Sequence, residues 1–374
     1  MKTILVPLLV LLTGWAMAQP SMDAESGMTV LKKTDHTSVK NQANTGTCWS
    51  FSTTSLVESQ TLHAGLGEFD LSEMYTVRNI YTEKARNYIL RQGTAQFGPG
   101  GLGHDVINAM ARFGAMPESI YSGLLLGKKS HDHTVLDSKL KSYLDSLLKI
   151  RPLPADWMKG FQHILDDNLG KAPETFTYKE KVYTPQSFAS DVLKFKRDDY
   201  VFFTSFTHHP FYSSFVLEQP DNYANESYYN VPLNELIRLT SAAVQKGYSV
   251  MWDADVSNPN FRQREGYAMQ WEGGPPAAGK PVDPDAKESA YDQQIRQQLF
   301  ENLTTQDDHL MHIVGVEKTK QGKPFFLVKN SWGEIGPFKG YINVSEAYFG
   351  INTISLVIPK AVLEPELKAK LGIK

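Results

Sequence analysis

The sequence predicts an α+β fold, with a helical first half and a β-rich second half. Apolar residues recur at helical spacing between Leu56 and Leu62, and Gly65 then offers a helix stop. Far downstream, residues 312–316 and 324–329 form two short apolar runs joined by a polar turn, which is typical of a hairpin of buried strands. The chain of 374 residues is long enough to build both halves around a sizeable core.

The N-terminal segment has the pattern of an export signal. Lys2 supplies a positive charge, residues 4–15 are mostly apolar, and Ala16-Met17-Ala18 offers a signal peptidase site. The apolar run of roughly a dozen residues is shorter than the about 20 that span a bilayer, although a retained anchor is the alternative. We therefore expect residues 1–18 to be a signal peptide, and the mature protein to be periplasmic or secreted without a membrane anchor.

The composition bears on the class of partner, through the net charge, and on chemistry, through a single thiol. A net charge of −3 gives no electrostatic reason to expect nucleic acid or an anionic membrane as partner. The chain holds a single cysteine, so an intrachain disulfide is impossible. A lone thiol outside the cytoplasm is a liability unless it is buried or used chemically.

Cys48 lies in a setting that favours chemical use. The turn at Gly46 precedes the predicted helix, which places Cys48 at the helix N-terminus, where free N–H groups and the helix dipole favour a thiolate. A thiolate is the nucleophilic form of cysteine. Gln42 precedes it by six positions, so its amide and the Cys48 backbone N–H can form an oxyanion hole.

A cysteine nucleophile needs a base and a group that orients the base. His312 opens the run 312–316, and Asn330 directly follows the run 324–329. A hairpin brings the start of its first strand beside the end of its second, so we expect His312 and Asn330 to be neighbours. Asn330 would then fix the imidazole tautomer, and Trp332 would shield their hydrogen bond from water.

Together these motifs resemble those of papain-like cysteine peptidases. The resemblance rests on Gln42-x5-Cys48-Trp-Ser-Phe and on the order His…Asn330-Ser-Trp-Gly. It implies a papain-like fold with a helical half over residues 19–197, a β-rich half over 198–360, and a cleft between them. Residues 361–374 would form a C-terminal tail. It also implies peptide substrates and catalysis by Cys48, His312, Asn330 and Gln42.

A paired glycine adds to the resemblance. Pro99-Gly100-Gly101 is similar to the cleft-lining glycines of papain-like enzymes, in which the second glycine pairs with the substrate backbone. The resemblance assigns that role to Gly101, next to Gly100. The same stretch formally fits a dinucleotide fingerprint, but no strand precedes it, as that fingerprint requires.

Further motifs resemble the bleomycin hydrolase, or aminopeptidase C, branch. Nucleophile and base lie much farther apart than the roughly 130–150 residues of papain, which indicates insertions; the candidates are residues 128–196 and 272–285. The matching segments are Leu71-Ser-Glu-Met-Tyr75, Asn230-Val-Pro-Leu-Asn-Glu-Leu236, residues 247–255, and Asp308-His-Leu-Met-His312.

This branch removes amino acids from free N-termini. A C-terminal arm in its cleft offers a carboxylate to the substrate ammonium, and by resemblance the Lys374 carboxylate would do so here. The branch also forms a ring-shaped homo-hexamer, so a homo-oligomer is expected. No metal or organic cofactor is implied, and activity should need a reduced thiol.

Other interpretations stay open or carry less weight. An endopeptidase with an open cleft and a catalytically silent peptide-binding protein are the two alternatives. Metal binding by His131-Asp-His133, by His208-His209 or by Asp307-Asp308-His309 is disfavoured, because none has a second, well-spaced ligand pair. A zinc site using His309 and His312 would also compete with the role of His312 as base.

Overall fold

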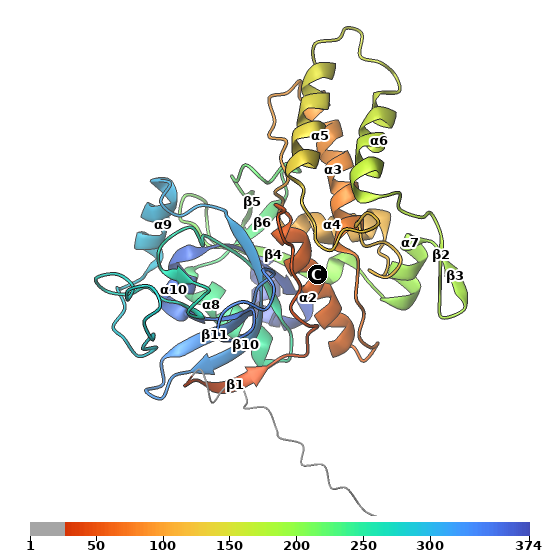
Figure 1. Cartoon of the computed structure of the whole chain (residues 1–374). Coiled ribbons are helices and arrows are strands. Elements are labelled where there is room, and N and C mark those ends of the chain that lie inside the picture. Colours follow the sequence, from red (N-terminus) through yellow and green to blue (C-terminus); the bar gives the residue numbers. More distant parts are fainter. Residues whose placement is uncertain (1–26) are drawn as a thin grey trace, which may run out of the picture.

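The computed structural model describes residues 27–374, so the predicted signal peptide lies outside the described residues. A helical half and a β-rich half pack side by side, with α2 between them (Figure 1). The helical half contains α2 (Cys48–His63), α3 (Glu73–Leu90), α4 (Gly103–Phe113), α5 (Thr134–Leu147), α6 (Trp157–Leu169), the short α7 (Pro185–Ser187), and a small hairpin of β2 (Phe176–Tyr178) and β3 (Lys181–Tyr183).

The β-rich half is built on one mixed sheet. Its path runs β5-β6-β4-β13-β7-β10-β11-β12-β9-β8, and β1 also pairs with β10. The strands are β1 (Thr29–Lys33), β4 (Tyr200–Thr204), β5 (Ser214–Val216), β6 (Ser227–Asn230), β7 (Val250–Ala254), β8 (Phe261–Arg262), β9 (Tyr267–Ala268), β10 (His309–Lys318), β11 (Pro324–Lys329), β12 (Tyr341–Ser345) and β13 (Thr353–Pro359). Residues 29–33 therefore belong to the sheet, although the sequence assigned residues 19–197 to the helical half.

The two faces of this sheet bury different cores. Side chains alternate along a strand, so Met251 and Leu310 pack toward the helical half, whereas Trp252 and Met311 pack on the opposite face. That opposite face is covered by α8 (Leu233–Gln245), α10 (Glu346–Asn352) and α11 (Pro365–Leu371). The short α9 (Gln293–Glu301) packs beside α10.

Helix α2 is the central element. Of its 16 residues, 13 are buried, because it packs against α3 and α4 on one side and β7 and β10 on the other. Many of these are serine and threonine, whose small side chains let neighbouring backbones approach closely. The start of α2 is thereby held against the start of β10.

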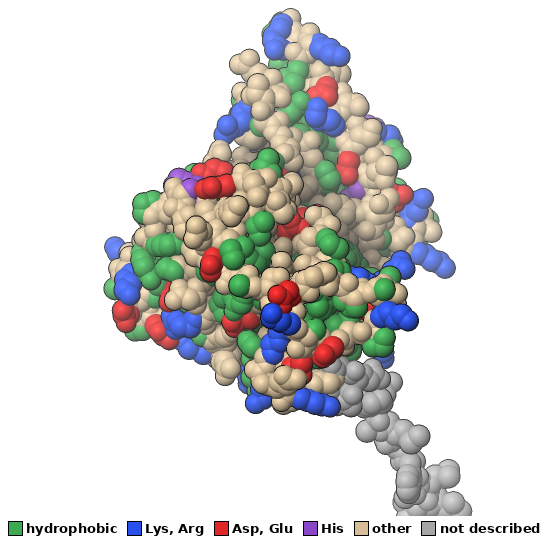
Figure 2. Space-filling view, turned by 90° about the vertical axis from the view of Figure 1, so that its left-hand side faces the viewer, with side chains coloured by type: hydrophobic (Ala, Val, Ile, Leu, Met, Phe, Trp, Pro, Cys, Tyr) green, Lys and Arg blue, Asp and Glu red, His purple; other side chains and the backbone are tan. Residues whose placement is uncertain are grey.

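The predicted insertion at residues 128–196 includes an antiparallel pair of helices, α5 and α6, which projects from the helical half (Figure 1). Its buried leucines pack α5 against α6, while the connection between them exposes Lys149 and Arg151. Figure 2 shows this projection rising above the β-rich half, with basic side chains at its tip. None of the helices within residues 27–374 is long and apolar enough to cross a membrane.

Candidate active site

Cys48 is the first residue of α2, as the sequence predicts, and only 9% of it is exposed. Burial raises the pKa of its thiol to about 12, partly offset by hydrogen bonds from the backbone N–H groups of Leu310 and Trp49. The contact with Leu310 shows that the sulfur lies against the first residues of β10. The thiol is thus positioned by two elements that are far apart in sequence.

His309 begins β10, directly before the residue that contacts the thiol. Its Nε2 lies 2.7 Å from Asn330 Oδ1, and the Trp332 ring stacks on its imidazole with 4.5 Å between ring centroids. Asn330 is oriented by two further bonds: the Ser331 N–H donates to Oδ1 at 2.7 Å, and Nδ2 donates to Gln263 Oε1 at 2.9 Å. Because Oδ1 can only accept, His309 carries its proton on Nε2, and Nδ1 is the basic nitrogen.

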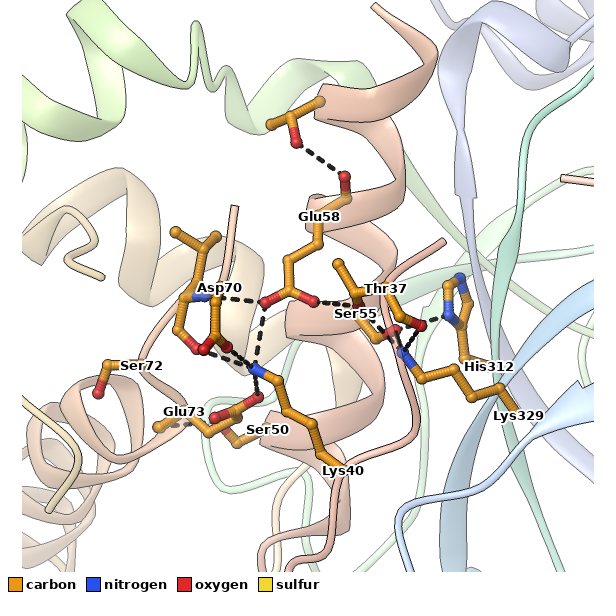
Figure 3. A network of polar contacts seen from close by, with 12 residues as sticks. Thr37, Lys40, Ser50, Ser55, Glu58, Asp70, Ser72, Glu73, His312 and Lys329 are labelled. Carbon is orange, nitrogen blue, oxygen red and sulfur yellow. Dashed lines mark hydrogen bonds and ion pairs between the residues drawn. The ribbon is translucent and has the colours of Figure 1, made fainter. Parts of the chain in front are cut away.

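His312 does not occupy this position. Its Nδ1 lies 2.9 Å from Ser55 Oγ, and Lys329 Nζ donates to the same hydroxyl at 2.7 Å (Figure 3). Ser55 follows Cys48 by seven residues of α2, which is about 10 Å along a helix. The predicted pairing of His312 with Asn330 is therefore wrong, because β10 begins three residues earlier than the apolar run indicated.

The surroundings of His312 suit a neutral structural side chain. Burial, followed by the charge of Lys329, lowers the pKa of His312 well below its usual value. Its Nε2 is buried and has no hydrogen-bond partner among the described residues. An imidazole in this position cannot exchange protons with a group bound at Cys48.

Burial acts on the protonation states of both Cys48 and His309. Burial lowers the pKa of His309 to about 4, against a weaker opposing effect of the Asn330 hydrogen bond. Considered singly, both groups are neutral at pH 7. If the thiol proton moved to Nδ1, the thiolate and the imidazolium would stabilise each other in a site of low dielectric constant.

Gln42 is hydrogen-bonded to Ser331, the residue after Asn330. Its backbone N–H donates to Ser331 O at 2.8 Å, and its Oε1 accepts from Ser331 Oγ at 2.6 Å. This leaves Nε2 as the donor end of the amide, with one hydrogen used for Thr45 O at 2.9 Å. The second hydrogen is available for an oxyanion near Cys48.

The glycine stretch also reaches the nucleophile. Trp49, which follows Cys48, donates from Nε1 to Pro99 O at 2.9 Å. A Cβ on Gly101 would lie 3.0 Å from the Trp49 ring, so the close approach of the chain here requires glycine. Gly100 and Gly101 are therefore brought beside the start of α2.

Lys374 lies elsewhere. It lines a pocket with Tyr200, Phe202 and Tyr229, at the β4 and β6 end of the sheet. Helix α11 leads to it and buries Leu367 in the core on the face opposite α2. In the sheet order, β13 and β7 separate β4 from β10, a lateral distance of about 14 Å. The expectation that the Lys374 carboxylate enters the cleft is wrong, because the tail folds as a helix on the far face.

A buried polar network holds the segment before Gln42 in place. Lys40 Nζ contacts Glu73 at 2.7 Å and the fully buried Glu58 at 3.2 Å, and Thr37 Oγ1 donates to Glu58 at 2.6 Å (Figure 3). Lys329 Nζ donates to Thr37 O at 2.8 Å from the β-rich half. The network joins α2, α3 and β11 around the N-terminal segment, and so sets the position of Gln42.

One cluster among the described residues has metal-ligating side chains close together: His208, His209 and Glu218. The two histidine Nε2 atoms lie 3.3 and 2.8 Å from the Glu218 carboxylate. Gln297 Oε1 accepts from the Thr207 N–H, so its Nε2 donates to His208 Nδ1 and the proton of His208 lies on Nε2. Hydrogen bonds to Glu218 therefore account for this geometry.

Comparison with known proteins shows which family and which relatives this chain resembles. Residues 93–373 match the Peptidase C1-like family, and residues 21–83 match the papain family of cysteine proteases. Aminopeptidase C of Streptococcus thermophilus is 24% identical over 88% of this chain and 81% of its own length. The mitochondrial cysteine proteinase 1 of Saccharomyces cerevisiae is 24% identical over 90% of this chain and 77% of its own.

A solved structure shares the fold. PepW from Lactobacillus rhamnosis superposes with a TM-score of 0.71 at 20% identity, over 94% of this chain and 87% of its own. The papain-like α+β fold predicted from the sequence is thereby confirmed, as is the resemblance to papain-like peptidases of the aminopeptidase C branch.

Proposed function

Because this chain belongs to the Peptidase C1-like family, we propose that it is a cysteine aminopeptidase that uses Cys48, His309 and Asn330 to hydrolyse peptide bonds next to free N-termini. The observation that carries the proposal is the bond from His309 Nε2 to Asn330 Oδ1, made at the point where β10 meets the thiol. Similarity to aminopeptidase C of Streptococcus thermophilus supports the choice of an aminopeptidase.

The first half of the reaction acylates Cys48. His309 Nδ1 takes the thiol proton, and the thiolate attacks the carbonyl carbon of the scissile peptide bond. The Cys48 backbone N–H and Gln42 Nε2 donate to the oxygen as it becomes negative. His309 then donates its Nδ1 proton to the departing amine, and the C–N bond breaks.

The second half releases the product. A water molecule enters where the amine left, and His309 Nδ1 removes its proton while the oxygen attacks the thioester carbon. Collapse of this second oxyanion breaks the C–S bond and returns the thiolate beside the imidazolium. Asn330 holds the imidazole in the same tautomer through both halves, which is the role of an orienting group in such triads.

Two fluorogenic substrates test this function. One is a leucyl amide with a free amine and the other is its N-acetylated counterpart, and both are assayed under reducing conditions with Cys48→Ala as the control. Hydrolysis of the free-amine substrate that Cys48→Ala abolishes is the expected result. Preference for the acetylated substrate would favour an endopeptidase, and turnover of neither would favour a peptide-binding protein.

Export is part of the same proposal. It rests on Lys2, on the apolar residues 4–15 and on the small residues Ala16 and Ala18. Intact mass measurement of the protein from the extracytoplasmic fraction is expected to give a chain that begins at Gln19. A chain beginning at Met1 in the cytoplasmic fraction would contradict export.

A further inference from the structure

Three carboxyl groups gather beside the nucleophile without a role in the mechanism above. Asp221 comes from the connection between β5 and β6, Asp253 from β7, and Asp307 from the segment before β10. After burial and the Leu310 hydrogen bond, the charges of Asp307 and Asp253 are the next influences on the pKa of Cys48, and both raise it. They are therefore close enough to the thiol to act on a group bound there.

Asp253 is the most deeply placed of the three. It is fully buried, and its Oδ2 accepts a hydrogen bond from Ser355 Oγ at 2.8 Å. Apart from the Asp307 carboxyl, its buried Oδ1 has no hydrogen-bond partner in the part of the chain that the structure describes. The Asp307 carboxyl lies next to Asp253 and interacts with it directly. Two facing carboxyls need either a shared proton or a cation between them.

The nearby cationic side chains donate to backbone carbonyls instead of lying between the two carboxyls. Lys84 Nζ donates to Gly98 O at 2.7 Å and Gly100 O at 2.5 Å, and Arg296 donates to the carbonyls of Ser205, Gly350 and Ile351. Among residues 27–374, no lysine or arginine forms an ion pair with any of the three carboxyls. Burial and the facing carboxyl therefore favour a proton shared between Asp253 and Asp307, which a bound cation can replace.

The cluster borders the cleft. A Cβ on Gly100 would lie 1.9 Å from Asp221 Oδ2, so only glycine lets this carboxylate lie against the stretch that flanks Trp49. Asp307 is half-buried, which leaves it reachable from solvent, and it precedes His309 by two residues. Asp221 thus lies against the glycine stretch, and Asp307 lies beside the start of β10.

We propose that Asp253 and Asp307, with Asp221 at the rim, bind the protonated α-amine of the residue whose carbonyl Cys48 attacks. This inference rests on the proposed aminopeptidase function and names how that function selects its substrate. A free ammonium can replace the proton that the two carboxyls share, and it donates hydrogen bonds to both. An acylated N-terminus carries no charge, so it cannot replace that proton.

The single cysteine allows a test that needs no turnover. Cys48 is labelled with the cationic reagent 2-aminoethyl methanethiosulfonate and with neutral methyl methanethiosulfonate, and the ratio of the two rates is taken. The variants are Asp253→Asn and Asp307→Asn, with Asp198→Asn as an exposed control. We expect the ratio to fall about tenfold in either variant and to be unchanged in the control. An unchanged ratio in both variants would overturn the proposal, and the use of two variants protects the test against one that fails to fold.

Turnover then identifies the source of the bound amine. Leucyl and alanyl amides with free amines should show KM values about tenfold higher in both variants, with kcat little changed. If only N-acetylated substrates carrying lysine or arginine are affected, the α-amine assignment is overturned in favour of a basic side chain. If the wild type hydrolyses no substrate, the proposed function fails, while the labelling ratio still decides whether the carboxyls select cations.

Discussion

His309 Nε2 donates to Asn330 Oδ1 across 2.7 Å, and the Trp332 ring covers the pair. This contact decides which nitrogen of His309 is basic, since the amide oxygen can only accept. It is also the reason why we propose His309 as the histidine that acts with Cys48. The proposed mechanism depends on this one pairing.

The orientation of Asn330 should matter almost as much as its presence. Asn330→Ala removes the acceptor that fixes His309, and we expect kcat to fall about 10- to 100-fold, as for other residues that orient a functional imidazole. Gln263→Ala removes only the group that holds Asn330 Nδ2 at 2.9 Å, so kcat should fall less, with KM unchanged. Steady-state kinetics on the leucyl amide measures both.

The matched control for this pair is Gln306→Ala, an exposed glutamine whose amide donates to Leu303 O. It should retain wild-type kinetics. Loss of activity in Gln306→Ala equal to that in Gln263→Ala would show that the effect is not specific to Asn330.

The sequence pattern predicts His312 rather than His309 for a physical reason. The apolar run that opens at His312 predicts that the strand starts there, but β10 begins at His309, among polar residues. The observed register pairs His312 with Lys329. Continuing it by three residues sets His309 opposite Trp332, which is where the stacked ring lies. The same register sets Met311 opposite Asn330, so the bond from His309 to Asn330 runs diagonally across the hairpin and could not be found by counting residues alone.

Other features of the fold could be predicted because each depends on a short stretch of sequence. The helix after Cys48, the hairpin of residues 312–329 and the paired glycines each follow from spacing and residue type over a short stretch. The cluster of Asp221, Asp253 and Asp307 could not be predicted from the sequence in this way. It joins three distant segments, and only the packing of α4 and β10 against β7 brings them together.

Gln42 is expected to stabilise the oxyanion. Gln42→Ala should lower kcat about 10²- to 10³-fold, the usual result of removing one oxyanion donor. Gln42→Glu keeps an acceptor for Ser331 Oγ but loses the Nε2 hydrogens, so it should be equally impaired. If Gln42→Glu retained full kcat, Gln42 would have a positioning role only. Stopped-flow acylation measured at saturating substrate isolates the step concerned.

The buried network around Lys40 should contribute to stability. Lys40→Met leaves Glu58 and Glu73 without their shared cation, and breaking a buried pair costs about 3–5 kcal/mol. We expect the free energy of unfolding in urea to fall by about that amount. Lys149→Met, in the exposed connection between α5 and α6, is the control and should change it by less than about 0.5 kcal/mol. Equal stability of the two variants would contradict a structural role for the network.

The carboxyl cluster predicts a pH dependence. Burial raises the pKa of Asp253 to about 7 and that of Asp307 well above its usual value. Asp253 is therefore a charged carboxylate above pH 7, and this charge is lost as the pH falls through 7. The preference of Cys48 for the cationic thiol reagent should decline from pH 8 to pH 6.

The charged or titratable groups that bear on Asp253 are Asp221, Asp307, Asp308, Tyr228, Arg296 and Cys48. Asp253→Asn should abolish the decline in the ratio of the two labelling rates between pH 8 and pH 6, and division by the neutral-reagent rate removes the effect of Asp253 on the pKa of Cys48. A decline that persists in Asp253→Asn would assign the titration to another member of this set.

The most direct measurement compares His309→Ala with His312→Ala on the leucyl amide, after circular dichroism has shown that both variants are folded. His309→Ala is expected to lose about 10²- to 10⁴-fold in kcat, the usual contribution of a positioned acid–base group. His312→Ala should keep kcat within about threefold, because its imidazole contacts Ser55 rather than a group near Cys48. Loss of turnover in His312→Ala with near-normal turnover in His309→Ala would contradict the account.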